Sequence, residues 1–581
     1  MSVLDRLDVV TKNNILTWLN GAYDSQTKAQ ITDWIEQENV TELTDSFYKN
    51  LEFGTGGLRG IMGVGSNRIN RYTIGAATQG FSNYLKSVYG DEEISVAIAY
   101  DCRNNATLFS QITADVFSAN GIKVYLFPEL RPTPQLSFAI RELGCKAGVM
   151  LTASHNPKEY SGYKAYWSDG GQLIAPHDKK VVEEVLKIGD VNDIRFTGNP
   201  SLVNLLGKEM DDQYVAALKK LSISGDAIAR QHDMSIVFSP IHGTGMPLVG
   251  DVLKSFGFTN VSYVEEQCTV DGNFPTVIYP NPEEHEALTL SIKKAREVGA
   301  DLVMATDPDA DRVGIAIQDN DGEFVLLNGN QTGSLLMYYV LKAWEKAGKL
   351  DGNQYVVKTI VTSQLMDRIA ESMHVTCYNV LTGFKFIGAL MTELEGKKTF
   401  VVGGEESYGY LVGEHARDKD AVVAAAMIAE MAAYYKDQGK SLYQALIELY
   451  VAYGFYKEKL ISITKAGKAG ADEIQSMMQR YREDTPVTLG GSDVVLLRDY
   501  TRQEEKNLKT GKTTRIELPK SDVLQFVTAD GSVISARPSG TEPKIKFYCS
   551  VNTKLASADA YKTVSDQLDA KIDSVMRDLG L

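Results

Sequence analysis

Short apolar runs alternate with longer amphipathic stretches over most of this chain, and polar loops follow directly after several of the apolar runs. Apolar runs of this length, separated by helical patterns, predict buried strands of a mainly parallel sheet. The predicted strands cover residues 94–100, 123–127, 147–151, 234–238, 301–306, 355–361 and 399–402. This alternation is typical of an α/β protein.

Three of these strands end in the same way. The stretches G-V-M-L-T-A-S, D-L-V-M-A-T-D and T-F-V-V-G-G-E each give an apolar strand, then small residues, then a loop that carries reactive side chains. We therefore predict three structurally repeated α/β domains with mixed, mainly parallel sheets and with these loops at the carboxyl ends of their strands. The active site would lie in a central cleft between the domains.

The two ends of the chain depart from this pattern. Residues 8–50 read as polar-rich helices, which we interpret as an N-terminal extension packed on the first domain. After about residue 455, charged helical stretches and short β-like runs predict a smaller α+β domain. The predicted domains are 1–205, which includes the extension, 206–322, 323–455 and 456–581.

The composition narrows the class of protein. A chain of 581 residues is too long for one hydrophobic core, and its hydrophobic share of 44% is ordinary for a globular protein. The net charge of −15 argues against binding of nucleic acid or of an anionic membrane surface, because both need a basic face. An anionic small-molecule substrate would instead need a local group of basic side chains.

Several features point to a cytoplasmic location. The five cysteines are scattered and form no C-x-x-C pair, which suits a reducing compartment and argues against a disulfide framework or a structural zinc site. The first residues show no signal-peptide pattern. The most apolar predicted helix, 421–435, contains Glu430 and is too short to cross a bilayer, so we expect it in the core.

Ser154 follows the strand 147–151 in the stretch T-A-S-H-N-P. A serine where a strand ends in a loop is well placed for ligand chemistry, but its hydroxyl is a weak nucleophile without a base or a metal. His155 is adjacent in sequence, which does not prove that the two side chains meet. Taken alone, the stretch is better explained as a polar turn between a strand and a helix.

Asp307, Asp309 and Asp311 follow the strand 301–306 with one residue between neighbours. That spacing points three carboxylates to one side of an extended loop, where they repel one another unless a cation lies between them. An EF-hand is excluded because its sixth and twelfth positions would be Arg312 and Gln318. Three carboxylates form a hard oxygen site that suits Mg²⁺, whereas a solvated acidic turn is the plainer alternative.

Two further loops could hold anions. The glycine-rich stretch F-G-T-G-G-L-R-G, which contains Arg59, needs tight turns or a close approach to a ligand, and it is not a Walker A loop. The stretch R-P-S-G-T-E-P-K combines hydroxyls and a glycine with basic side chains suited to phosphate. Its candidate ligand-binding residues are Arg537, Ser539, Gly540, Thr541 and Lys544.

Two more stretches are candidates for substrate binding, and the first of them offers an acceptor and a donor to sugar hydroxyls. G-E-E-S-Y-G carries Glu405 and Ser407, and its glycines allow the backbone to approach a ligand closely. T-G-F-K supplies Thr382, Gly383 and Lys385. His242, in H-G-T-G after another strand, is as readily structural as functional.

Taken together and in this order, T-A-S-H-N-P, D-P-D-A-D-R, G-E-E-S-Y-G and R-P-S-G-T-E-P-K resemble the α-D-phosphohexomutase family of phosphoglucomutases, phosphomannomutases and relatives. The resemblance covers nearly the whole chain. The form E-E-S-Y-G and the aromatic Phe384 before Lys385 look like the glucose-preferring branch. The dual-specificity branch has a histidine at the position of Phe384, so no base can be assigned there by resemblance.

The resemblance implies an isomerase that interconverts α-D-glucose 1-phosphate and 6-phosphate through phosphorylated Ser154 and a glucose 1,6-bisphosphate intermediate. It implies that Mg²⁺ is bound by Asp307, Asp309, Asp311 and the phosphoserine. The remaining implied catalytic residues are Arg59, His155 and Lys164. The implied substrate-binding residues are Arg312, Thr382, Gly383, Lys385, the sugar-contacting Glu405 and Ser407, and the phosphate-binding Arg537, Ser539, Gly540, Thr541 and Lys544.

Other functions stay open at this point. Within the same class these are phosphomannomutase or phosphopentomutase activity and, with less support, synthesis of glucose 1,6-bisphosphate. A sugar-phosphate-binding protein without turnover would not need the serine together with all three aspartates. A serine hydrolase would favour G-x-S-x-G, which differs from T-A-S-H-N. We expect a small-molecule substrate, no nucleic-acid or membrane partner, and a monomer, with a dimer as the alternative.

Overall fold

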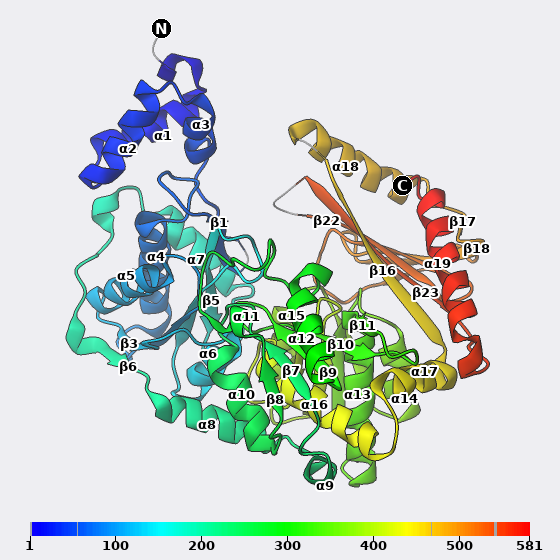
Figure 1. Cartoon of the computed structure of the whole chain (residues 1–581). Coiled ribbons are helices and arrows are strands. Elements are labelled where there is room, and N and C mark those ends of the chain that lie inside the picture. Colours follow the sequence, from blue (N-terminus) through cyan, green and yellow to red (C-terminus); the bar gives the residue numbers. More distant parts are fainter. Residues whose placement is uncertain (1–2, 55, 466, 540–542) are drawn as a thin grey trace.

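The computed structural model describes residues 3–54, 56–465, 467–539 and 543–581. Domain I lies at the left of Figure 1, domain IV at the upper right, and domains II and III below and between them. Three helices cap domain I at its upper end: α1 (Val9–Asn20), α2 (Ser25–Glu36) and α3 (Val40–Phe47). They form the predicted N-terminal helical extension, and Asp24 joins it to domain I by accepting a hydrogen bond from the Tyr72 hydroxyl at 2.6 Å.

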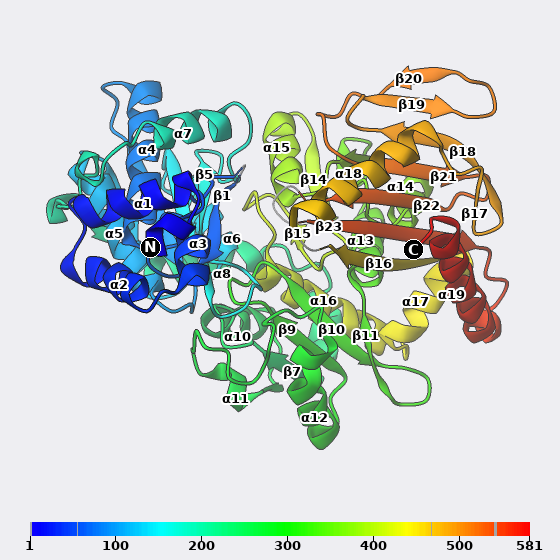
Figure 2. The ribbon, with the colours of Figure 1, turned by 90° about the horizontal axis from the view of Figure 1, so that it is seen from above.

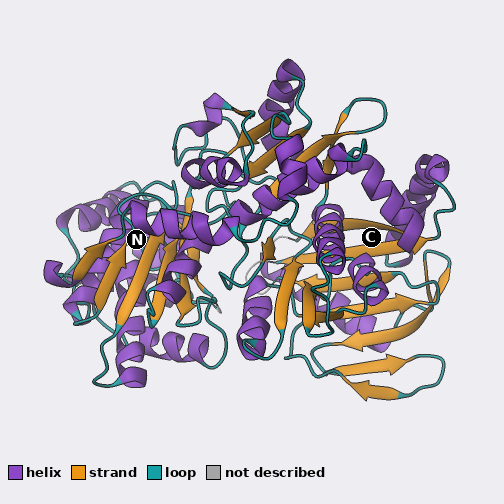
Figure 3. Cartoon of the chain, turned by 90° about the horizontal axis from the view of Figure 1, so that it is seen from below, coloured by secondary structure: helices purple, strands orange, loops and turns teal. Residues whose placement is uncertain are grey.

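Domain I is built on a six-stranded sheet of order β1-β5-β4-β2-β3-β6, flanked by helices on its faces (Figure 3). The pairs β2–β3, β2–β4 and β3–β6 are parallel, and β4–β5 and β1–β5 are antiparallel. Its elements are β1 (Gly57–Ile61), α4 (Arg71–Tyr89), β2 (Ser95–Tyr100), α5 (Ala106–Ala119), β3 (Lys123–Leu126), α6 (Thr133–Glu142), β4 (Ala147–Leu151), β5 (Tyr160–Trp167), α7 (His177–Leu186) and β6 (Val203–Leu205).

Domain II carries a five-stranded sheet of order β11-β10-β9-β7-β8, in which parallel and antiparallel pairs are equal in number. Its elements are α8 (Lys208–Lys219), α9 (Gly225–Arg230), β7 (Ile236–Ser239), α10 (Met246–Phe256), β8 (Val261–Tyr263), α11 (Glu265–Cys268), α12 (Thr289–Val298), β9 (Leu302–Thr306), β10 (Val313–Gln318) and β11 (Phe324–Leu327).

Domain III has a four-stranded sheet of order β13-β12-β14-β15 with only its last pair antiparallel. Its elements are α13 (Gly329–Lys346), β12 (Gln354–Thr359), α14 (Leu365–Ser372), β13 (Thr376–Val380), α15 (Phe384–Leu394), β14 (Thr399–Gly404), β15 (Tyr410–Val412), α16 (Ala421–Asp437) and α17 (Leu442–Tyr453).

Helix α16 confirms the prediction of a core helix at 421–435, since it is buried along almost its whole length and packs on α9 and α10 of domain II. The helix carries one buried carboxylate, that of Glu430, and both of its oxygens have hydrogen-bond partners. Glu430 accepts hydrogen bonds from the Ser222 and Tyr339 hydroxyls and from the backbone N–H groups of Ile223 and Ser224. A buried carboxylate is tolerated only with such partners. No helix within the described residues is long and apolar enough to cross a membrane.

Domain IV is the predicted smaller α+β domain, with an entirely antiparallel sheet of order β16-β23-β22-β21-β18-β19-β20 and β17 paired to β18. The hairpin β19–β20 extends this sheet on the side away from the neighbouring domains (Figure 2). Its elements are β16 (Phe455–Thr464), α18 (Gly467–Glu483), β17 (Thr488–Leu489), β18 (Ser492–Asp499), β19 (Glu504–Asn507), β20 (Thr513–Arg515), β21 (Leu524–Thr528), β22 (Val533–Pro538), β23 (Lys544–Thr553) and α19 (Tyr561–Asp578).

The three repeated domains share a feature that the sequence pattern does not reveal. Each reactive loop joins a strand with a parallel neighbour to an antiparallel partner: β4 to β5, β9 to β10, and β14 to β15. Each loop also holds one non-glycine residue in the left-handed region, with φ of 51° at Ser154, 46° at Ala310 and 66° at Tyr408. Such conformations cost free energy and persist where the surroundings impose them.

Candidate active site

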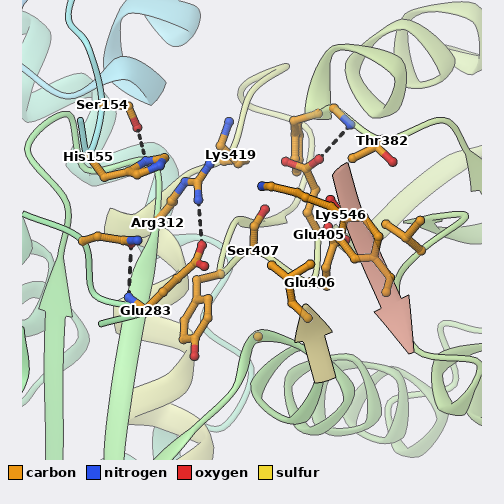
Figure 4. Close-up of a pocket in the computed structure, with 18 of the residues that line it drawn as sticks. Ser154, His155, Glu283, Arg312, Thr382, Glu405, Glu406, Ser407, Lys419 and Lys546 are labelled. Atoms are coloured by element: carbon orange, nitrogen blue, oxygen red, sulfur yellow. Dashed lines mark hydrogen bonds and ion pairs between the residues drawn. The ribbon is translucent and has the colours of Figure 1, made fainter. Parts of the chain in front are cut away.

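A cleft of about 1,130 Å³ opens between the four domains, and loops from all of them line it. Figure 4 shows part of this lining, from Ser154 on one side to Glu405, Glu406 and Lys546 on the other. The cleft brings together most of the predicted site residues: Arg59, Ser154, His155, Lys164, Asp311, Arg312, Thr382, Gly383, Lys385, Glu405, Ser407, Arg537 and Lys544. Asp307 and Asp309 are buried beneath its floor. Gly540 and Thr541 lie outside the described residues.

The Ser154 hydroxyl lies at the domain I end of the cleft and is nearly buried, with 3% of the residue exposed. Its Oγ is 3.0 Å from Oδ2 of Asp307 in domain II and 3.1 Å from Nδ1 of His155. The backbone N–H of Ser154 donates to the Thr152 hydroxyl, which in turn donates to Asp101. The adjacent histidine therefore does meet the serine, although a metal-ligand candidate is at least as close.

Arg103 holds the backbone of the serine loop, and it was not predicted as a site residue from the sequence. This buried guanidinium donates to four backbone carbonyl oxygens around the loop, those of Ser154, Asn156, Pro157 and Tyr160, at 2.5–2.8 Å. Arginine suits this role because its planar fork presents several donors in fixed directions. The available signal was its position directly after the strand β2.

The three predicted metal ligands converge. One carboxylate oxygen from each of Asp307, Asp309 and Asp311 lies within 4.8 Å of the others. Oδ1 of Asp307 accepts the backbone N–H groups of Asp311 and Arg312, which fixes the turn. Oδ1 of Asp309 and Oδ1 of Asp311 are buried and have no hydrogen-bond partner among the described residues. Buried carboxylate oxygens left in this way fit a hard cation such as Mg²⁺.

Electrostatics support a cation at this point. Burial, together with the charges of Asp311 and Asp309, raises the pKa of Asp307 well above its ordinary value. Burial would also raise the pKa of Asp311, but the ammonium groups of Lys164 and Lys419 outweigh it and hold that pKa below its usual range. A divalent cation would relieve the repulsion that the two lysines only partly offset.

Two buried lysines bridge the acidic loop to its neighbours. Lys164 Nζ of domain I lies 2.6 Å from Asp309 and 3.1 Å from Asp311, and Lys419 Nζ of domain III lies 3.1 Å from Asp311. Lys164 was predicted, whereas Lys419 was missed. Its only sequence signal is the charged run R-D-K-D directly before the apolar helix α16.

Backbone hydrogen bonds from domains I and III hold the acidic loop in place. The N–H of Thr133 in domain I donates to the Asp309 carbonyl oxygen at 2.9 Å, and the N–H of Ala421 in domain III donates to the Ala310 carbonyl oxygen at 3.1 Å. The N–H of Val313 donates to the Tyr408 carbonyl oxygen at 3.1 Å. The acidic loop is therefore held from both sides, and its strained geometry is imposed by three domains.

The predicted sugar-contacting residues gather on domain III. Glu405 accepts a hydrogen bond from the Gly383 N–H at 2.9 Å, which joins its loop to the start of α15. Burial raises the pKa of Glu405 to about 7. Glu406 accepts hydrogen bonds from the hydroxyls of Thr359 and Thr362 and so serves the local structure. Glu405 is thus the better placed of the two to receive a sugar hydroxyl.

Arg312 extends into the cleft between His155 and Glu283, and its guanidinium lies 2.7 Å from the Glu283 carboxylate (Figure 4). Burial, aided by the nearby charges of Arg312 and Arg59, lowers the pKa of His155 well below its ordinary value. The imidazole is therefore neutral next to Ser154. Glu283, from the P-N-P-E stretch, was not predicted as a site residue.

The predicted phosphate-binding loop lies on domain IV, across the cleft from Ser154. Arg537 at the end of β22 and Lys544 at the start of β23 are half-buried and line the cleft. Lys546, which sequence reasoning missed, pairs with Arg537 across the two strands. Burial and the neighbouring charges of Lys544 and Arg537 lower the pKa of Lys546. None of these three cations forms an ion pair with a carboxylate of the described residues.

A serine beside three clustered carboxylates, facing cations across a cleft between repeated α/β domains, is the arrangement expected of a metal-dependent enzyme that transfers a phosphoryl group. Family models of the phosphoglucomutase/phosphomannomutase α/β/α domains I, II and III match residues 50–191, 212–322 and 328–453, and the model of the C-terminal domain matches 497–562. The chain therefore belongs to the phosphoglucomutase/phosphomannomutase family.

Individual relatives agree with this assignment. The chain is 37% identical over 542 residues to a phosphoglucomutase of Staphylococcus haemolyticus, covering 93% of this chain and 96% of the relative. It is also 37% identical to a phosphoglucomutase of Staphylococcus aureus strain MRSA252, covering 92% and 95%.

Solved structures share the fold. The open form of parafusin, a Paramecium phosphoglucomutase, superposes with a TM-score of 0.66 at 18% identity, covering 92% of this chain and 96% of that one. A phosphoglucomutase/phosphomannomutase family protein of Burkholderia thailandensis gives 0.64 at 18% identity, covering 90% and 98%. At this level of identity these likenesses concern the fold alone, and they match the four-domain α/β architecture.

Proposed function

We propose that this chain is a phosphoglucomutase that interconverts α-D-glucose 1-phosphate and glucose 6-phosphate through a phosphorylated Ser154. The observation that carries the proposal is the position of the Ser154 hydroxyl, 3.0 Å from Asp307 within the acidic cluster. Glucose is proposed as the sugar because relatives at 37% identity over nearly their whole length are phosphoglucomutases.

The proposed reaction consists of two phosphoryl transfers. The C6 hydroxyl of glucose 1-phosphate attacks the phosphorus on Ser154, so that the O6–P bond forms while the P–Oγ bond breaks and the hydroxyl proton leaves. The glucose 1,6-bisphosphate then reverses its orientation without leaving the cleft. The Ser154 Oγ attacks the phosphorus at C1, the P–O1 bond breaks, O1 gains a proton, and glucose 6-phosphate departs.

The residues of the cleft fit distinct parts of this reaction. Asp307, Asp309 and Asp311 would hold a Mg²⁺ ion, which supplies Lewis-acid stabilisation of charge on the transferred phosphoryl group. His155 and Lys164 flank the serine and the acidic loop and are the proposed groups for proton transfer. Arg59 hydrogen-bonds Asn156 of the serine loop from the neighbouring strand β1 and adds positive charge.

The far side of the cleft would orient the sugar. Glu405 and Ser407 are proposed to bind the sugar hydroxyls in both orientations, with Arg312, Thr382, Gly383 and Lys385 around them. Arg537, Ser539, Gly540, Thr541 and Lys544 are proposed to hold the phosphate that is not reacting, by charge-assisted hydrogen bonds. Catalysis of this kind depends chiefly on positioning and charge stabilisation.

We also propose a cytoplasmic monomer that uses glucose 1,6-bisphosphate as its activating intermediate. All five cysteines are free, which suits a reducing compartment. The proposed site residues all come from one chain, so a second copy is not needed to complete the cleft.

Two measurements test the proposal together. Intact-mass and peptide mass spectrometry of the purified protein should find one phosphate, located on Ser154. Turnover should then be compared for the 1-phosphates of glucose, mannose and ribose. Glucose is expected to be preferred; a preference for mannose or ribose would make the enzyme a phosphomannomutase or phosphopentomutase. Absence of both the phosphate and any turnover would favour a sugar-phosphate-binding protein and overturn the proposal.

A further inference from the structure

A segment of domain II, residues 269–276, crosses onto domain I directly behind the serine loop. The Asn104 side chain donates a hydrogen bond to the Asn273 side chain at 3.0 Å. At Gly272 the two backbones come so close that an added Cβ would lie 2.5 Å from the Asn104 nitrogen and 2.8 Å from the Cys102 carbonyl oxygen. Only glycine fits such an approach. We name residues 269–276 the domain II strap.

Phe274 is the residue of the strap that faces Arg103. Its ring is 2% exposed, and the Arg103 guanidinium carbon lies 5.3 Å from the ring centroid. This distance is within the range of a cation–π interaction, which strengthens where water is excluded. Phe274 has a φ of 49°, a left-handed conformation that is unfavourable for a bulky residue. The backbone is therefore held in a costly shape that puts the aromatic ring over the guanidinium.

His242 fixes the strap in that shape. Its Nδ1 lies 2.8 Å from the Thr269 carbonyl oxygen, and its Nε2 lies 2.8 Å from the Thr276 hydroxyl, so one imidazole ties both ends of the strap. A carbonyl oxygen can only accept, so Nδ1 carries the proton and Nε2 accepts from Thr276. The Thr276 hydroxyl in turn accepts from Gln267. His242 is 1% exposed and is not among the residues that line the catalytic cleft.

Arg103 connects this arrangement to the nucleophile. Its guanidinium edge holds four carbonyl oxygens around the serine loop, and its Nε lies 3.5 Å from the buried Asp101 carboxylate. A guanidinium so engaged at its edge can be restrained further only through its face, where Phe274 lies. Ser154 itself has a positive φ, so its loop depends on surrounding contacts to keep that shape.

We propose that Phe274, held by His242, is a positioning residue for phosphoryl transfer: the domain II strap clamps Arg103 so that the Ser154 hydroxyl stays aimed at the acidic cluster. The clamp would also make the serine loop and the acidic loop, which lie on different domains, move as one unit. This inference rests on the proposed function, and it adds a pair of residues that touch neither substrate nor metal.

The test compares two substitutions of the same residue in the full-length protein. Phe274→Leu keeps an apolar side chain but removes the ring, whereas Phe274→Tyr keeps the ring. We expect Phe274→Leu to lower kcat about tenfold while KM changes less than about twofold, because binding groups are untouched and only the aim of the nucleophile is lost. Phe274→Tyr should recover most of kcat. Hydrogen exchange of the peptide covering residues 153–160 should quicken in Phe274→Leu only.

Phe256→Leu is the matched control, since Phe256 is a buried phenylalanine of the same domain on α10, away from Arg103. It should lose stability without a change in kcat or in exchange of the serine loop. Equal kcat values for Phe274→Leu and Phe256→Leu, or unchanged loop exchange in Phe274→Leu, would overturn the proposal. If Phe274→Leu does not fold, His242→Gln replaces it, with the same expected direction and the same refuting result.

The exchange measurement separates this inference from the proposed function. Should the wild-type protein fail to turn over glucose 1-phosphate, the proposed function falls, yet the clamp still predicts faster exchange of residues 153–160 in Phe274→Leu than in Phe274→Tyr. If the wild-type protein is an active mutase but the two variants show equal hydrogen exchange and equal kcat, the positioning role of Phe274 is refuted. The proposed function is then unaffected.

Discussion

Ser154 and the acidic cluster lie at a buried end of the cleft that three domains build jointly, whereas Arg537 and Lys544 lie at the other end on domain IV alone. At the first end the ammonium groups of Lys164 and Lys419 pair with Asp309 and Asp311 and partly offset the charge of the three carboxylates. At the second end the cations are half-buried and crowd one another, as the lowered pKa of Lys546 indicates. The groups around Ser154 are thus held by contacts from three domains, whereas Arg537, Lys544 and Lys546 form no ion pair with a carboxylate of the described residues.

Domain IV also differs from domains I to III in the kind of contact that joins it to its neighbours. Domains I to III are joined by buried ion pairs and by backbone hydrogen bonds at the acidic loop. Domain IV meets domain III mainly through apolar packing, which includes a continuous buried core and the rings of Tyr443 and Tyr450 against Tyr561. The Gln525 side chain also donates a hydrogen bond to the Ile360 carbonyl oxygen at 2.7 Å. The chain enters domain IV through Gly454, which has a φ of 101°, next to stacked Tyr450 and Phe455. Polar contacts around the acidic loop thus join domains I to III, whereas domain IV is attached mainly by apolar packing away from that loop.

The largest effect is expected from Ser154→Ala, at the end of the cleft that holds the acidic cluster. Turnover should fall by several orders of magnitude because the covalent nucleophile is lost, while thermal unfolding stays close to that of the wild type. Activity assays and intact mass measure both consequences. Ser161→Ala is the control, since Ser161 is also buried, on β5, and its hydroxyl has no described hydrogen-bond partner. Near-normal activity in Ser154→Ala would remove the serine from its assigned role.

Removal of the metal should have the next largest effect. A chelator is expected to abolish activity and Mg²⁺ to restore it, because buried carboxylates repel one another without a cation. Asp309→Asn should lower turnover by at least about a hundredfold. The exposed Asp321 provides the matched control, Asp321→Asn, which should change nothing. Full activity in chelator, with no metal found by elemental analysis, would contradict the acidic cluster as a metal site.

A smaller effect is expected at the domain IV end. Arg537→Ala should raise KM by about tenfold to a hundredfold, the equivalent of about 1.5–3 kcal/mol for a lost charged hydrogen bond, with a lesser effect on kcat. Steady-state kinetics with glucose 1-phosphate measures the change. Arg515→Ala, on the exposed strand β20, is the control and should leave KM unchanged.

We also expect domain IV to close over bound sugar phosphate, with a hinge near residues 450–460. Closure would exclude water from phosphoserine and bring basic groups to an otherwise acidic protein only when they are needed. Small-angle scattering with and without a substrate analogue should show compaction. No compaction together with an unchanged KM in Arg537→Ala would rule out the closing domain; unchanged scattering alone would leave a cleft that is already closed.

The smallest effect concerns Glu458 on β16, where domain IV meets domain III. Burial raises the pKa of Glu458 to about 7 in the folded protein. The folded state then binds its proton more tightly than the unfolded state, so this group costs stability as pH rises from about 4.5 to about 7. Glu458→Gln should therefore raise the unfolding temperature at pH 8 but not at pH 5. Thermal unfolding at both values checks this, with exposed Glu504→Gln as the control; equal shifts at the two values would contradict it.

The apolar runs and the loops after them could be interpreted from the sequence alone. Strands β4, β9 and β14 lie where the pattern placed them, and Ser154 and the three aspartates meet as their motifs implied. Local order decides these features, because a continuous apolar strand must be buried and a polar loop after it must stay at the edge of the sheet. The exact domain boundaries stay a prediction, and α16 shows why: it follows the domain III hairpin in sequence but packs on domain II.

Only the tertiary structure revealed Arg103, Lys419, Lys546 and Glu283. Lys419 meets Asp311 from more than a hundred residues away, and Arg103 acquires its role from carbonyl oxygens some fifty residues further along the chain. A lone arginine or lysine in sequence is equally well explained by a solvated surface. The packing of sheets and domains decides which groups such a side chain contacts. Its direction and the burial of its charge are set only when segments distant in sequence come together.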